Sequence, residues 1–163
     1  MDHNMFCFQC EQTAGCTGCT SRGVCGKDAQ TAQAQDRLTG ALIGLARAAD
    51  TSPDAGPETW QLMIEGLFAT LTNVNFDPDS LNALTGRVRA EKQRLVPDCA
   101  VCTAPCGRTG DYDLAQLWGA QEDIRSLKSL LLFGSRGMAA YAYHAMVLGY
   151  RDESVECLSL IHI

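Results

Sequence analysis

Cysteine is the residue type with the most chemistry to offer in this sequence. Nine cysteines occur, and five fall within nineteen residues near the start: Cys7, Cys10, Cys16, Cys19 and Cys25. Thiolates this close in sequence can converge on one site at little loop-closure cost. Converging thiolates bind iron–sulfur clusters or structural zinc, whereas five free thiols in one loop would be prone to oxidation. The first group of cysteines therefore predicts a metal centre.

The five cysteines offer two alternative sets of four ligands. The first set is Cys7, Cys10, Cys16 and Cys19, two CxxC pairs separated by five residues. It resembles a zinc site, although zinc ribbons separate their pairs by roughly 15–20 residues. The second set replaces Cys16 with Cys25 and has gaps of two, eight and five residues, which fits an iron–sulfur loop better. Spacing alone does not choose between the two sets.

A second group of cysteines lies in the middle of the chain. It consists of Cys99, Cys102 and Cys106, and Cys157 stands alone near the end. Three closely spaced thiols need a fourth ligand from elsewhere, such as Cys157 or Cys16, to complete a metal site. We favour a surface loop with free thiols, and a labile second metal site is the alternative.

Length and charge limit the classes of protein to which the chain can belong. It has 163 residues, 46% of them hydrophobic, which is enough for a domain with its own core. The formal net charge of −6 argues against nucleic-acid binding, which needs clusters of basic residues. We see no signal segment at the start and no stretch apolar enough for a membrane span. We expect a cytoplasmic protein that binds neither membranes nor nucleic acid.

Helices are the elements that must position these cysteines. Residues 1–27 show neither a helical nor a strand period, so we expect a loop wrapped around the metal site. Apolar residues then recur at helical spacing, with turn and cap signals between the runs. These patterns predict helices over residues 29–49, 57–71 and 78–96.

A further helical stretch is predicted from about residue 112. Its apolar stripe, which includes Ile124, Leu127 and Leu131, lies on one face of the predicted helix. Gly134 and Gly137 are expected to interrupt it before a last helix that ends near residue 148. The sequence therefore predicts an all-α fold, a helical bundle with an N-terminal cysteine-rich loop that binds a cluster.

Several segments resemble one known family. They are Met5–Ala14, Thr17–Thr20, Gly23–Lys27, Asn73–Phe76, Glu122–Phe133 and Arg136–Ala145. On these residues the sequence resembles the N-terminal domain of the hybrid cluster proteins, also called prismane proteins or hydroxylamine reductases. The resemblance divides the chain into an iron–sulfur loop at 1–27, a helical bundle at 28–155 and an unmatched tail at 156–163.

The resemblance implies a cofactor and its ligands. In this family the N-terminal domain holds a [4Fe-4S] cubane, which places the ligands at Cys7, Cys10, Cys19 and Cys25 and makes Cys16 a bystander. Catalysis in the family occurs at a second, hybrid [4Fe-2O-2S] cluster, whose ligands come from later domains that this chain lacks. We therefore expect cluster-binding residues here and no catalytic ones.

The resemblance also implies an oxidoreductase. A small redox electron donor would supply electrons through the cubane to the hybrid cluster, where hydroxylamine is reduced to ammonia. Nitric oxide is a further substrate attributed to the family. The expected partners are thus the donor, hydroxylamine and the missing C-terminal domains. Two alternatives stay open: a zinc-stabilised helical interaction module, and an inactive truncated fragment.

Overall fold

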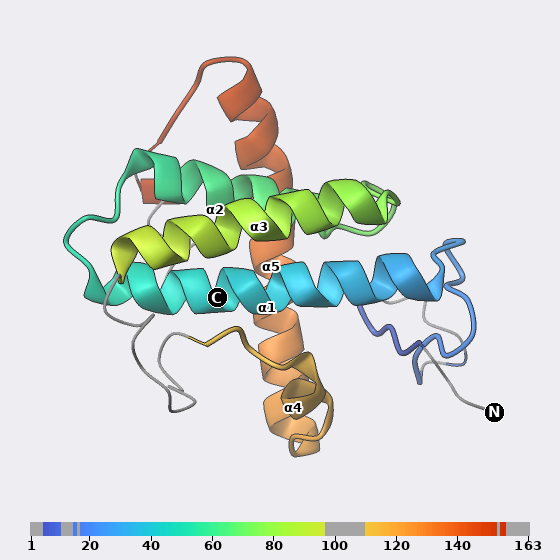
Figure 1. Ribbon diagram of the computed structural model, residues 1–163. Helices are drawn as coiled ribbons and strands as arrows, with labels where there is room; N and C mark the ends of the chain where they lie inside the picture. The colour runs from blue at the N-terminus through green and yellow to red at the C-terminus, as the bar shows by residue number, and fades with distance from the viewer. Residues whose placement is uncertain (1–4, 11–14, 16, 97–109, 153, 156–163) are drawn as a thin grey trace.

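The fold of the chain is helical throughout the part that can be described. The computed structural model describes residues 5–10, 15, 17–96, 110–152 and 154–155. The named helices are α1 (Ala29–Thr51), α2 (Pro57–Ala69), α3 (Pro78–Leu95), α4 (Leu114–Trp118) and α5 (Glu122–Val147) (Figure 1). In these residues the strand-like structure is an isolated bridge between Cys7 and Cys19. The predicted all-α fold is confirmed.

Helix α1 is the central helix of the molecule. It begins after Asp28, whose side chain accepts a 2.8 Å hydrogen bond from the backbone N–H of Thr31. This cap satisfies a free N–H group of the first turn and lowers the pKa of Asp28. The predicted stripe of Leu38, Leu42 and Leu45 is fully buried. α1 packs along α3 and against α2 (Figure 1), so the prediction of this helix and its inward face is confirmed.

Helices α2 and α3 begin where the sequence predicts. Pro57 is the first residue of α2, where its missing N–H leaves no intrahelical bond unmade. Asp77 precedes α3, and its side chain accepts a 3.0 Å hydrogen bond from the backbone N–H of Asp79. The ends of the two helices lie within two residues of the predicted ends. Local capping chemistry therefore fixes both starts.

The predicted interruption of the last helical stretch is wrong. The helical structure is divided at residues 119–121, between α4 and α5, and α5 continues through Gly134 and Gly137. A glycine in a helix interior costs only about 1 kcal/mol relative to alanine. Two glycines are therefore not enough to end a helix of 26 residues.

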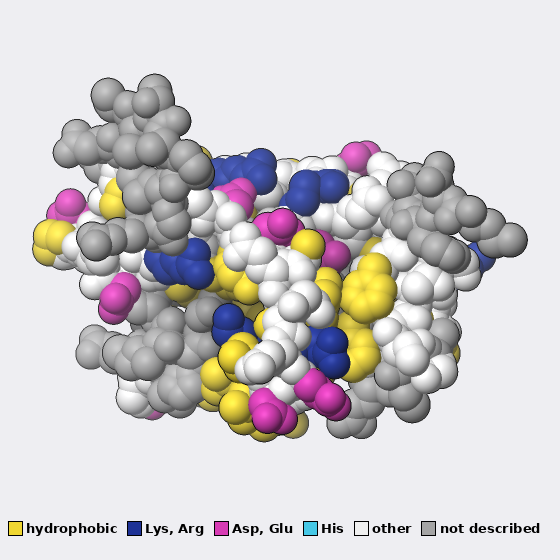
Figure 2. Space-filling view, turned by 90° about the horizontal axis from the view of Figure 1, so that it is seen from below, with side chains coloured by type: hydrophobic (Ala, Val, Ile, Leu, Met, Phe, Trp, Pro, Cys, Tyr) yellow, Lys and Arg dark blue, Asp and Glu magenta, His cyan; other side chains and the backbone are white. Residues whose placement is uncertain are grey.

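The apolar stripe predicted for this stretch is buried at Leu114 and Leu117 but not farther along. Ile124, Leu127 and Leu131 are exposed, and Figure 2 shows hydrophobic side chains among charged ones at the end of the molecule where α4 and the start of α5 lie. α5 crosses the other long helices, and its second half packs against α2 (Figure 1). Ala139 and Tyr143 in that second half join the core. The stripe in the first half extends beyond the helices that would cover it.

The core lies between α1, α2, α3 and the second half of α5. Arg136 of α5 reaches into it, where its Nε donates to the Thr70 hydroxyl and its Nη2 to the Thr39 hydroxyl, both at 3.0 Å. Burial lowers the pKa of Arg136 to about 10, against the opposing effect of Asp36. A separate small core, which contains Met5, Cys7, Cys19 and Ala32, holds the cysteine loop against the start of α1. No described helix combines the length and apolar character that crossing a membrane requires.

Candidate metal centre

Two of the predicted ligands are joined by backbone hydrogen bonds. The N–H of Cys7 donates to the carbonyl of Cys19, and the N–H of Cys19 donates to the carbonyl of Cys7, each at 2.9 Å. Both cysteines are buried, and they pack with Met5 and with Ala32 of α1. The bridge therefore brings together two thiols that are twelve residues apart and fixes them on the helical body.

A tight turn places the third thiol. The N–H of Gly23 donates to the carbonyl of Lys27 at 2.7 Å, and the N–H of Gly26 donates to the carbonyl of Gly23 at 2.8 Å. A Cβ on Gly23 would lie 3.0 Å from the sulfur of Cys25 and 3.0 Å from the Cβ of Lys27. Gly26 has a φ of +92°, which favours glycine. Glycine is therefore needed on both sides of Cys25 for the chain to close around its sulfur.

All four cysteines of the second predicted set line one cavity. Cys7, Cys10, Cys19 and Cys25 surround a volume of about 310 Å³ together with Gln9, Lys27 and the segment at Thr72 and Asn73. Cys10 and Cys25 are partly exposed there, and Cys7 and Cys19 are buried. Cys16, the second group of Cys99, Cys102 and Cys106, Cys157 and the tail at 156–163 lie outside the described residues.

The donor chemistry of the four thiols suits an iron–sulfur cluster or a zinc ion. A zinc ion holds each thiolate at about 2.3 Å, so four sulfurs around it would lie within about 4 Å of one another. An iron–sulfur cluster binds its thiolates at different irons and so spreads them around a larger volume. A cavity lined by four thiols has the donor chemistry that such a cluster needs.

The surroundings of Cys7 have opposing effects on the pKa of its thiol. Burial raises the pKa of its thiol, while the positive charge of Lys27 lowers that pKa in part. Asp36 of α1 stands behind the loop, where it accepts a 2.6 Å hydrogen bond from the Gln9 side chain. Burial raises the pKa of the Asp36 carboxyl to about 6, against the smaller effects of Gln9 and Arg136. The Cys7 thiol thus lies within the influence of a buried positive charge on Lys27 and a partly buried carboxyl on Asp36.

An aromatic cluster joins the cysteine loop to α4. The rings of Phe6 and Phe8 each meet Trp118 edge-on, with centroids 5.6 Å apart. The two phenylalanines flank Cys7 in the sequence, so their rings cover the loop next to a predicted ligand. Trp118 is a partner of these rings that the sequence did not reveal. Edge-to-face packing of this kind is favourable and holds the start of the cysteine loop against α4.

Two glycines of α1 allow α4 to reach this position. A Cβ on Gly40 would lie 2.2 Å from the carbonyl oxygen of Tyr112, and one on Gly44 would lie 2.9 Å from that of Gly110. The backbone N–H of Tyr112 donates to the carbonyl of Gly40 at 3.0 Å. The segment before α4 therefore lies directly on α1. The spacing of four residues, which puts both glycines on one helix face, is the signal in the sequence that could have found this contact.

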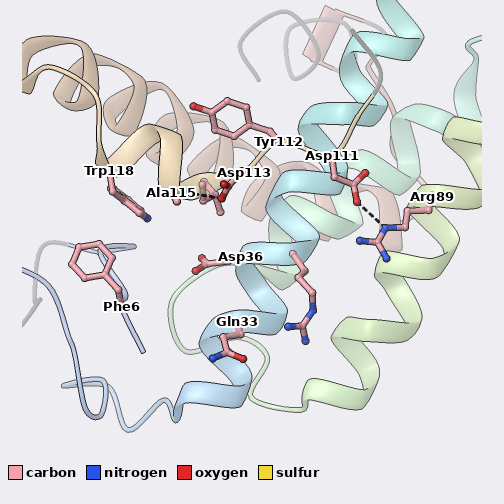
Figure 3. A pocket seen from close by; sticks show the side chains of 11 residues that line it. Phe6, Gln33, Asp36, Arg89, Asp111, Tyr112, Asp113, Ala115 and Trp118 are labelled. Carbon is pink, nitrogen blue, oxygen red and sulfur yellow. Dashed lines mark hydrogen bonds and ion pairs between the residues drawn. The ribbon is translucent and has the colours of Figure 1, made fainter. Parts of the chain in front are cut away.

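A second, polar pocket lies beside the aromatic cluster. Figure 3 shows Phe6 facing Trp118 on one side of it, and Asp36 on α1 in its wall. Asp111 binds Arg89 at 2.8 Å and Lys92 at 2.5 Å across this region. These partners hold the pKa of Asp111 below its usual range against the effect of burial. No cysteine lines this pocket among the described residues, so the thiol cavity is a separate site.

Comparison with known proteins decides the family of the chain. The model of the Prismane/CO dehydrogenase family matches residues 5–162. The chain belongs to this family. The "Hydroxylamine reductase" of Desulfitobacterium hafniense strain Y51 is 40% identical over 172 residues, which cover 93% of this chain and 31% of the relative. The proteins of the same name from Porphyromonas gingivalis strain ATCC 33277 and Methanocella arvoryzae are 37% and 39% identical.

The family match covers nearly all of this chain and a smaller part of its relatives. The chain spans about a third of the length of the curated proteins that it matches. The resemblance to prismane proteins, drawn from the cysteine spacing and the segments around Glu122–Ala145, is therefore confirmed. In this prismane chain the sequence analysis named the four thiols that line the cavity, but it gave no role to Lys27, which also lines it, or to Gln35 and Asp36, which bind Lys27 and Gln9.

Proposed function

We propose that this chain is the electron-transferring N-terminal part of a hydroxylamine reductase. The observation that carries the proposal is the single cavity lined by Cys7, Cys10, Cys19 and Cys25, which we assign as the ligands of a [4Fe-4S] cluster. Relatives at 37–40% identity are named hydroxylamine reductase, which supports the class of reaction. A reducing cytoplasm, where clustered thiols stay available for metal, is the compartment that suits such a centre.

When bound, the cluster supplies a one-electron relay between a small redox protein and a hybrid [4Fe-2O-2S] cluster in further domains. The whole enzyme would take up two electrons and two protons, break the N–O bond of hydroxylamine and release ammonia and water. Nitric oxide is a second possible substrate for the same centre. No residue of this chain is assigned to that bond cleavage.

The residues of this chain bind and shield the cluster. The four thiolates supply its protein ligands, and the Cys7–Cys19 bridge and the turn at Gly23 hold three of them in place. Phe6, Phe8 and Trp118 cover the loop and limit the access of water. Hydrogen bonding to sulfur and exclusion of solvent are two of the means by which a protein tunes the potential of an iron–sulfur cluster.

Anaerobic reconstitution with iron and sulfide tests the proposal. The native chain is expected to bind about four irons and four sulfides and to give a cubane EPR signal after reduction with dithionite. Cys25→Ser should abolish this, since it removes a ligand. Cys16→Ser is the matched control, because it makes the same change in the same loop and should leave the cluster intact.

Three outcomes would contradict the proposal. A colourless protein that holds one zinc would support a zinc-stabilised interaction module instead. Equal loss of the cluster in Cys16→Ser and Cys25→Ser would show that the ligand set is wrongly chosen. A native chain that binds neither iron nor zinc and aggregates would favour an inactive truncated product.

A further inference from the structure

Lys27 is an unusual neighbour for a set of thiols. Its side chain is only 1% exposed, which makes it one of the most deeply buried large side chains in the described part of the protein. Its ammonium group donates to the side-chain oxygen of Gln35 and lies 3.8 Å from the sulfur of Cys7. An ammonium removed from water is costly unless a negative charge and hydrogen bonds compensate for it.

No carboxylate of the described residues forms an ion pair with Lys27. Of the charges that act on the Cys7 thiol, that of Lys27 has the largest effect, and that of Asp36 has a smaller effect of opposite sign. The thiolates that line the cavity are therefore the natural counter-charge of this lysine.

Gln35 fixes the position of the ammonium group. Its side-chain oxygen accepts from Lys27, and its side-chain nitrogen donates to the carbonyl of Asn75 at 2.9 Å. An amide has one accepting and one donating end, so these two partners together define its orientation. Gln35 is itself buried on α1, where its backbone carbonyl accepts from the Thr39 hydroxyl at 2.8 Å.

The backbone of Lys27 is fixed as well. Its carbonyl accepts from the N–H of Gly23, and the contacts of Gly23 leave no room for a side chain between Lys27 and Cys25. Both ends of the lysine side chain are thus held, the backbone by the turn and the ammonium by Gln35. A charge held in this way cannot move away when the charge of its neighbour changes.

We propose that Lys27, held by Gln35, is a positioning residue that raises the reduction potential of the cluster bound at Cys7. The proposal rests on the proposed function, because it needs a cluster at these thiols. Reduction adds one negative charge to the cluster. A fixed positive charge and a hydrogen-bond donor next to a ligand sulfur stabilise that added charge more than the oxidised form.

A redox titration of the iron-loaded chain, followed by EPR, tests this role. Lys27→Met removes the charge at nearly constant volume. At any fixed potential it should lower the ratio of reduced to oxidised cluster by about tenfold, which corresponds to about 59 mV for one electron. Lys27→Arg keeps the charge and should stay within about threefold of the native ratio. Iron and sulfide content should be unchanged in both variants.

Lys92→Met is the matched control for the change in net charge. Lys92 of α3 is also a partly buried lysine, but it pairs with Asp111 and does not line the thiol cavity. This variant should leave the potential unchanged. Lys27→Gln provides a second test if the methionine variant does not fold, because it removes the charge and keeps a hydrogen-bonding group.

The outcomes separate the inference from the proposed function. A native chain that takes up no iron and sulfide overturns both. Normal iron and sulfide content with an unchanged potential in Lys27→Met or Lys27→Gln overturns the inference alone. Loss of the cluster in both uncharged variants, with retention in Lys27→Arg, would also overturn it, since Lys27 would then be needed for assembly rather than for the potential.

Discussion

The two longest helices of this protein both carry an apolar stripe, but they differ in how much of that stripe they bury. Helix α1 buries 14 of its 23 residues, and its leucines form the centre of the core. Helix α5 buries four of its 26 residues, and these are Ser129, Ser135, Arg136 and Ala139. Meanwhile Leu127 and Leu130 of α5 are 63% and 67% exposed. Both helices carry an apolar stripe, but in the first half of α5 Leu127, Leu130 and Leu131 are exposed, and Leu132 packs against the core.

The difference shows what helical periodicity can and cannot predict. An apolar stripe indicates that a helix has a face to bury, and it carries no information about which element covers that face. In α1 the stripe meets α2 and α3 of the same domain. In the first half of α5 the stripe remains on the surface of the described structure, as an exposed apolar patch of the kind that marks interaction sites (Figure 2).

The largest expected effect comes from truncating one leucine on each helix. Leu42 is fully buried and lies so close to α2 that a Cβ on Gly66 would be 2.6 Å from its Cδ2. Leu42→Ala should therefore lower the free energy of unfolding by about 3–4 kcal/mol, through lost burial and the cavity left behind. Leu130→Ala should change it by less than about 0.5 kcal/mol, since Leu130 is exposed.

Urea unfolding of the two variants beside the native chain measures both changes. The comparison of the helices fails if Leu130→Ala destabilises the chain as much as Leu42→Ala does. That result would mean that the first half of α5 is covered in solution, for example by association of two chains, and the midpoint would then depend on protein concentration.

The three helices α1, α2 and α3 were predictable because their signals are local. Pro57, Asp77 and the leucine stripe of α1 act within one or two turns of the residues that carry them. The break between α4 and α5 was not predictable in the same way. Asp113 caps the start of the short α4 by accepting from the N–H of Ala115 at 2.9 Å, and the preceding segment contacts α1, but neither feature marks where α4 ends.

The candidate site likewise has local features that the sequence indicates and long-range contacts that it does not. Cysteine spacing limited the ligands to two sets, and family resemblance selected Cys25 over Cys16. The long-range contacts around the site have no such pattern. Trp118 meets Phe6 across more than a hundred residues, and the Lys27–Gln35 pair joins a turn to a helix. Single buried polar residues of this kind are visible only once the fold places them.

A smaller effect is expected where the two helices interact electrostatically. Asp36 of α1 is partly buried, and its pKa is raised from 3.8 to about 6, mainly by desolvation, with Arg136 of α5 opposing. A raised carboxyl pKa stabilises the folded state below about pH 4, and this contribution is lost as the pH rises through about 6. In Asp36→Asn this decrease in the free energy of unfolding with rising pH should be absent. Its stability relative to the native chain should rise by up to about 2 kcal/mol between about pH 4 and about pH 7, allowing for partial exposure.

Urea midpoints of both proteins across this pH range give the difference directly, because the other titrating groups cancel. Asp79→Asn, which removes an exposed carboxyl in the first turn of α3, is the matched control for the loss of one negative charge. If the stability difference between Asp36→Asn and the native chain does not change with pH, the Asp36 carboxyl is fully hydrated. Arg136 would then have no buried carboxyl on α1 to interact with.

The smallest effect uses one substitution on both helices, Gly to Ala, and the two results should have opposite signs. On α5 a Cβ at Gly134 would meet nothing within 4 Å, so Gly134→Ala should gain about 0.5–1 kcal/mol from helix propensity. On α1 a Cβ at Gly40 would lie 2.2 Å from the carbonyl oxygen of Tyr112. Gly40→Ala should therefore lose roughly 1–2 kcal/mol, since the segment before α4 must move away and helix propensity offsets only part of the cost.

Tryptophan fluorescence separates these two contributions in the same samples. Displacement of the segment before α4 should move Trp118 away from Phe6 and Phe8. Without denaturant, Gly40→Ala should therefore shift the tryptophan emission to longer wavelength, and Gly134→Ala should leave it unchanged. Trp60 contributes a constant background, because it lies on α2 and packs against the core. A Gly40→Ala variant that is more stable than the native chain and has native emission would contradict this prediction. It would mean that the segment before α4 does not pack on Gly40, and that another contact holds Trp118 next to Phe6 and Phe8.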